Sequence, residues 1–189
     1  MRFYVDTENV GLTWVNDLAQ LTEADHVIVF YTINSQHLTF PIVEHMVATK
    51  ASLEFVECFT GTNALDFQLV TRLGYDLKSY PRSQFIIISK DRGFNAVSNF
   101  WRKQGKEVTR TDSIGTFVEV IKQYRVPAKR IAKFAKTIDV EMTPMDAIGY
   151  LRKQAVSSSD CHNALQGVYG MKGREIFQFI REECLCKSG

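Results

Sequence analysis

The sequence contains little cysteine and no paired cysteine motif. Its cysteines are Cys58, Cys161, Cys184 and Cys186, and no two of them form a CxxC pair. Because zinc sites usually need such pairs, we expect no zinc centre, and the thiols should be reduced as in cytoplasmic proteins. Long apolar runs are also missing, so neither a membrane span nor a signal peptide is expected. The protein should be soluble and cytoplasmic, without a membrane partner.

The chain carries no strong overall charge. Its formal net charge is +2, which gives no global argument for a nucleic-acid partner. The charge is uneven, however: residues 1–119 hold 11 basic and 14 acidic side chains, a net of −3, whereas residues 120–189 hold 12 and 7, a net of +5. A basic region that faces a partner and two ordinary solvated surfaces both agree with this distribution.

Short apolar runs predict five strands, at residues 2–5, 26–31, 52–56, 84–89 and 107–109. The runs "VIVFY" and "FIIIS" are continuously apolar, which is typical of parallel strands buried on both faces. Helical periodicity over residues 12–21, 39–49, 63–77 and 93–104 separates the strands, with Gly74 expected to weaken or end the third helix and Gly105 to end the fourth. This alternation predicts an α/β fold with an open parallel sheet flanked by helices.

After residue 112 the strand signal fades and helical signals continue. Residues 115–125 have a helical pattern, Pro127 is expected to begin another helix, and Pro144 a further one with Thr143 as its N-cap. Two more short helices are expected within residues 157–184, with His162 in a packing or capping role. We therefore predict a domain over residues 1–125 and a small helical module over residues 126–189.

Acidic side chains follow the predicted strands. Asp6 and Glu8 come directly after the first strand, Asp91 follows the fourth, Asp112 follows the fifth, and Asp66 lies near the start of the third helix. Ligands of open α/β sheets bind at the carboxyl ends of the strands, near the point where the strand order reverses. If the first and fourth strands are neighbours, Asp6 and Asp91 converge at that point.

Carboxylates gathered at one edge repel each other unless a cation lies between them. A hard divalent ion, Mg²⁺ or Mn²⁺, relieves this repulsion and assists hydrolysis of phosphodiester bonds. Each acid also has a simpler explanation: Asp6 as a turn residue, Asp66 and Asp91 as helix caps, Asp112 as a loop acid, and Glu8 as either surface or site. The set indicates a metal site more strongly than any single member.

Three stretches resemble the NYN branch of the PIN-like ribonuclease superfamily: "YVDTENVG", "GTNALDFQLVTRLG" and "IIISKDRGFNAVSNFWRKQGKEV". That family has Asp-x-x-Asn after its first strand, here Asp6 and Asn9. It has an Asp at the start of its third helix, here Asp66, and Ser-x-Asp after its fourth strand, here Ser89 and Asp91. The resemblance covers residues ~1–112.

This resemblance implies a five-stranded parallel sheet, a Mg²⁺ or Mn²⁺ site and endoribonuclease activity. It makes Asp6, Asp66 and Asp91 the catalytic metal ligands, with Glu8 and Asp112 as candidate further ligands. It also implies that Asn9 and Ser89 orient these carboxylates or contact substrate, although a turn role is equally open for both. Lys90 and Arg92, beside the motif, are candidates for holding phosphates, and a plain surface role is open for them as well.

The sequence departs from the family at Gly93. Many relatives have a second Asp there, and its loss opens an alternative function: a catalytically weak PIN-like protein that binds RNA or protein. In the C-terminal region, Lys129, Lys133 and Lys136 fall on one helical face, which either tracks an RNA backbone or is an ordinary solvated face. The expected partner is RNA, in single-stranded form, and a homodimer is left open.

Overall fold

The structure, a computed structural model, describes residues 1–185, without the side chains of Val156, Cys184 and Leu185. The Cys184-x-Cys186 pair therefore lies outside the described side chains. In chain order the elements are β1 (Arg2–Asp6), α1 (Thr7–Val10), the 3₁₀ helix η1 (Thr13–Gln20), β2 (His26–Tyr31), α2 (Phe40–Ala48), β3 (Ser52–Glu57), α3 (Ala64–Ser79), β4 (Phe85–Ile88), α4 (Phe94–Lys103), β5 (Val108–Thr111), α5 (Ile114–Thr137), α6 (Pro144–Val156), α7 (Ser158–Tyr169) and α8 (Met171–Leu185).

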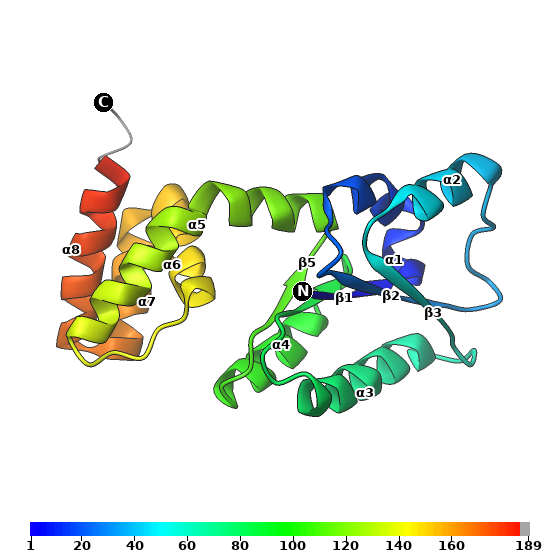
Figure 1. Cartoon of the computed structure of the whole chain (residues 1–189). Helices are drawn as coiled ribbons and strands as arrows, with labels where there is room; N and C mark the ends of the chain where they lie inside the picture. The colour runs from blue at the N-terminus through cyan, green and yellow to red at the C-terminus, as the bar shows by residue number, and fades with distance from the viewer. Residues whose placement is uncertain (186–189) are drawn as a thin grey trace. The chain divides into compact units, whose positions relative to one another are not determined.

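The strands form one sheet in the order β3-β2-β1-β4-β5, and all neighbouring strands are parallel. In the middle of the sheet, Phe3 of β1 lies between Val27 of β2 and Ile86 of β4. This confirms the predicted open five-stranded parallel sheet with flanking helices, which Figure 1 shows with α3 and α4 on one side and α2 on the other. The chain first moves outward from β1 to β3 and then returns to β4, so the strand order reverses between β1 and β4.

Alternation along β1 assigns its side chains to the two faces of the sheet. Tyr4 is fully buried in the cluster that α3 and α4 form over one face, together with Leu69 and Phe94. Phe3 points to the other face, where its ring meets Phe117 of α5 edge-on at 6.0 Å. Because side chains two apart share a face, Arg2, Tyr4 and Asp6 all project toward α3.

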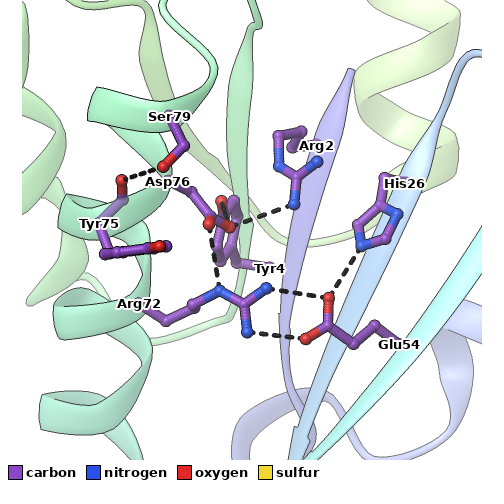
Figure 2. A network of polar contacts seen from close by, with 8 residues as sticks. All are labelled: Arg2, Tyr4, His26, Glu54, Arg72, Tyr75, Asp76 and Ser79. Carbon is purple, nitrogen blue, oxygen red and sulfur yellow. Dashed lines mark hydrogen bonds and ion pairs between the residues drawn. The ribbon is translucent and has the colours of Figure 1, made fainter.

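A buried ionic network lies where β1 begins, and Figure 2 shows it. Asp76 of α3, only 1% exposed, accepts hydrogen bonds from the Arg2 guanidinium at 3.2 Å, the Tyr4 hydroxyl at 2.7 Å and Arg72 Nε at 3.2 Å. Arg72 also forms a two-pronged pair with Glu54 of β3, at 2.7 and 3.0 Å. The network therefore fixes the C-terminal half of α3 on the sheet.

Two glycine predictions have different outcomes. Gly105 adopts a positive φ of 72° just beyond α4, as a helix-ending glycine should. Gly74, in contrast, does not end α3, which continues to Ser79. A Cβ at residue 74 would lie 3.6 Å from Trp101 of α4, an ordinary van der Waals distance, so the packing of α3 on α4 would also accept a small side chain here.

The chain divides into two compact units, the first comprising residues 1–118 and the second beginning at Glu119. The predicted boundary after residue 125 falls within α5, which belongs to both units. The prediction that Pro127 begins a helix is wrong, because Pro127 lies inside α5. Apolar side chains from both sides of it, including Ile121 and Ile131, pack into one cluster, and this burial offsets the hydrogen bond that proline cannot donate.

The second unit packs α6, α7 and α8 around that cluster. Thr143 caps α6 as predicted, and its hydroxyl accepts the Asp146 N–H while the Asp146 carboxylate accepts the Thr143 N–H. The His162 ring packs edge-on against Phe177 at 4.9 Å, which agrees with the predicted packing role. Among residues 1–185, no helix has both the length and the apolar content that crossing a membrane requires.

Candidate active site

The candidate site lies where the strand order reverses, at the carboxyl ends of β1 and β4. The condition under which Asp6 and Asp91 were expected to converge is met, because β1 and β4 are neighbours, with Val5 beside Ile88. Asp6 is the last residue of β1, and Ser89 and Asp91 follow β4 directly. The sheet therefore brings two of the predicted acid motifs to one edge, in the position where open α/β sheets bind ligands.

Asp6 is fully buried and closely held by its neighbours. Its Oδ2 accepts hydrogen bonds from the Asn9 side-chain amide at 2.6 Å and from the Ser89 hydroxyl at 2.7 Å. Its Oδ1 accepts the backbone N–H of Asn9 at 3.2 Å, so Asp6 also caps the short helix α1. Three hydrogen bonds to one carboxylate fix its orientation.

Ser89 joins the two acid motifs. It is fully buried, and its hydroxyl donates to Asp6 and accepts the backbone N–H of Asp91 at 3.0 Å. Asp91 itself is exposed, and its Oδ1 accepts the N–H of Gly93 at 2.8 Å. A Cβ at residue 93 would lie 3.2 Å from that carboxylate oxygen, so glycine leaves room for this arrangement.

Asp66 lies in the first turn of α3, and the lengths of α3 and β1 indicate how far along the sheet it reaches. The C-terminal half of α3 is fixed at Arg2 through Asp76, and the helix runs back toward the carboxyl ends of the strands. From Asp76 to Asp66 the helix rises about 15 Å, and from Arg2 to Asp6 the strand advances about 13 Å. The two lengths match, so Asp66 lies beside the end of β1.

The electrostatics of Asp66 agree with that position. Partial burial raises the pKa of its carboxyl, and the negative charges of Asp6, Asp91 and Glu8 raise the pKa further. The charges of the other three acids therefore reach Asp66 at the carboxyl edge. Asn63 precedes the helix and has a positive φ of 56°. Its side chain forms no capping hydrogen bond to the first turn of α3.

The remaining predicted acids occupy the margins. Glu8 is exposed and its Oε1 accepts the Thr32 hydroxyl at 3.2 Å. Asp112 is 65% exposed and pairs with Arg110 of β5. Arg110, which sequence reasoning missed, also donates to the Ser89 carbonyl at 2.7 Å and so supports the β4 motif. A basic residue in a short edge strand beside an acid motif was the available signal.

The described residues do not form a finished metal centre. Within residues 1–185, no three histidine, cysteine, aspartate or glutamate side chains are gathered closely enough to hold an ion. The donor set nevertheless fits a hard divalent cation, because Asp6, Asp66 and Asp91 all offer carboxylate oxygens and their charges oppose one another. Without a cation between them, such groups are expected to stand apart.

The predicted basic residues are exposed. Lys90 and Arg92 flank Asp91 in the loop after β4. Lys129, Lys133 and Lys136 are exposed on α5, on the side away from the buried Ile131 and Ala135. These positions suit contacts with a polyanion and equally suit ordinary solvation.

Comparison with known proteins adds one finding. A family model described as PIN domain matches residues 1–111. No curated protein and no solved structure gave a match.

Proposed function

The chain belongs to the PIN domain family, whose members are typically metal-dependent nucleases, and we propose that it is a divalent-metal-dependent endoribonuclease. The observation that carries this proposal is the junction at Ser89, whose hydroxyl links the buried Asp6 carboxylate to the backbone of Asp91. Such a link fixes the Asp6 carboxylate and holds the backbone at Asp91 beside it. We further propose the NYN branch of the family, on the motifs around Asp6 and Asp91.

Asp6, Asp66 and Asp91 would hold Mg²⁺ or Mn²⁺, with Glu8 or Asp112 as further candidates. When bound, such an ion supplies charge neutralisation at the phosphate and lowers the pKa of a coordinated water. The chain's own residues then position the carboxylates. Asn9 and Ser89 hold both oxygens of Asp6, and outer partners of this kind commonly change metal affinity or activity by about 10- to 100-fold.

The substrate we propose is single-stranded RNA in the cytoplasm. Lys90 and Arg92 are exposed beside Asp91, where they could contact phosphates on either side of the cut. The exposed stripe of Lys129, Lys133 and Lys136 would add non-specific affinity for the backbone. The domain boundary after residue 125, the contribution of the helical module and a homodimer remain predictions.

Cleavage of a labelled single-stranded RNA in Mn²⁺ tests the proposal. Asp6→Asn and Asp91→Asn should each abolish cleavage while far-UV circular dichroism stays unchanged. Glu44→Gln is the matched control, because it removes an exposed negative charge from α2, on the other side of the sheet from Asp66. If both aspartate variants cleave RNA as well as the wild type and the control, the carboxyl edge of the sheet is not the catalytic site.

A PIN-like RNA- or protein-binding protein without catalysis is the second candidate. The glycine at residue 93, in place of a second acid beside Asp91, favours it. Melting in EDTA and in Mn²⁺ discriminates between the two functions. A catalytic metal site should raise the melting temperature with Mn²⁺ in the wild type but not in Asp6→Asn, since ligand binding stabilises the folded state by mass action.

A further inference from the structure

A cavity of about 520 Å³ lies over β2 and β3, on the face of the sheet opposite α3. Its floor includes Val29 and Tyr31 of β2 with their register partners Phe55 and Glu57 of β3. Side chains two apart share a face, and Val29 is in register with Val5, which lies on the face opposite Tyr4. The loop after β2 and the start of η1 form the walls, and the volume is within the range of about 300–1,000 Å³ for small-molecule sites.

The cavity adjoins a second hollow, which contains the candidate further ligand Glu8. This hollow of about 450 Å³ also contains Asn34 and shares five lining residues with the cavity: Thr7, Gly11, Leu12, Ser35 and Gln36. Thr7 directly follows Asp6, and its hydroxyl bonds with Ser35 at 2.9 Å. Asp6 projects toward α3 and the cavity lies on the opposite face, so a strand at the acids would reach the cavity by crossing the carboxyl edge of the sheet beside Glu8 and Thr7.

The lining indicates a neutral aromatic ligand. Trp14, Tyr31, Phe55 and His37 offer aromatic rings, and none of the described residues that line the cavity is lysine or arginine. Glu57 would repel a phosphate but accept a hydrogen bond from an amino group. Bases carry flat aromatic faces and exocyclic amino groups, whereas the backbone between them carries the negative charge.

Apolar side chains that line the cavity are left exposed. Phe55 and Ile33 are 46% and 77% exposed at this place. Exposed apolar groups gathered around a hollow are typical of a surface that a ligand covers.

We propose that this cavity holds one unstacked base of the RNA strand whose phosphodiester lies at Asp6, Asp66 and Asp91. The inference rests on the proposed function and adds a reason for it to act on single strands. A base paired within a duplex cannot enter the cavity without leaving its stack, which costs a few kcal/mol. The enzyme would therefore prefer single strands, loops and ends.

Binding in EDTA, where no cleavage occurs, tests the inference. The probes are fluorescein-labelled octauridylate and octaadenylate, and a ribose-phosphate octamer of equal charge without bases. Phe55→Ala should weaken binding of the strands with bases by about fivefold or more, since stacking contributes about 1–3 kcal/mol per base, and leave the abasic octamer unaffected. Phe100→Ala is the matched control, because Phe100 is a 56% exposed phenylalanine on α4.

The salt dependence identifies the occupant. The slope of log K against log salt should be equal in the wild type and in Phe55→Ala, because a base carries no counterions to release. A lower slope in Phe55→Ala would mean that phosphate occupies the cavity, and it would overturn the inference. Equal affinity of the wild-type protein for strands with and without bases would also overturn the inference, because no base would then contribute to binding. The occupant of the cavity would then be sought among protein side chains.

The proposed function has its own separate readout. If Asp6→Asn abolishes Mn²⁺-dependent cleavage but Phe55→Ala binds every probe as the wild type does, the nuclease assignment stands and the base site is wrong. If base-dependent binding is lost in Phe55→Ala while no variant or wild type cleaves RNA, the base site stands and the catalytic proposal is wrong.

Discussion

Asp76→Asn should strongly lower the free energy of unfolding, although asparagine has almost the same shape as aspartate. The carboxylate is 1% exposed and compensates two guanidinium groups, those of Arg2 and Arg72 (Figure 2). Removing one partner of a buried ion pair leaves a charge without compensation and typically costs about 3–5 kcal/mol. Because domains are stable by only about 5–15 kcal/mol, Asp76→Asn should lose a large part of the total.

Urea unfolding followed by tryptophan fluorescence measures this loss in the first compact unit of the chain, since both tryptophans, Trp14 and Trp101, lie in residues 1–118. Glu54→Gln is the control within the same network. Glu54 is 34% exposed, so solvent screens its pair with Arg72, and its removal should cost no more than about 1 kcal/mol. If Asp76→Asn loses less than about 1 kcal/mol, the buried charges are not compensated by Asp76 and the reasoning fails.

Three further predictions concern the site and the second unit. Ser89→Ala should lower Mn²⁺-dependent cleavage about tenfold or more with little change in fold, because Asp6 loses the donor that orients it, and initial rates at saturating RNA measure the effect. The pKa of Asp66 is raised in the folded chain, so without metal the folded state binds this proton more tightly than the unfolded state, and stability falls as the pH rises above the ordinary carboxyl pKa. Asp66→Asn should therefore raise the melting temperature in EDTA at pH 7. A gain in melting temperature that does not shrink toward pH 4 would contradict this explanation. Gly173→Ala should destabilise the second unit by about 1–3 kcal/mol, because the added Cβ collides with the Leu165 carbonyl of α7; circular dichroism should show an earlier transition while the tryptophan transition stays in place.

Much of the fold followed from local pattern. Continuous apolar runs at β2 and β4 predicted buried parallel strands, and the alternation with helices predicted the open sheet. The errors occurred where packing overrode a local preference. Pro127 is a good helix start by itself but lies inside α5, where apolar residues on both sides of it are buried, and Gly74 does not end α3, which continues to Ser79.

The sequence alone determined which acids follow which strands, because residue order and hydrophobic runs are local properties of the chain. It could not determine that the Ser89 hydroxyl bonds Asp6, since these residues are far apart in sequence and meet only when β4 pairs with β1. The same holds for Arg110 beside Ser89 and for the cavity between Trp14 and Phe55. Tertiary structure decides such contacts, because they depend on strand order and register, which arise only when the whole sheet forms.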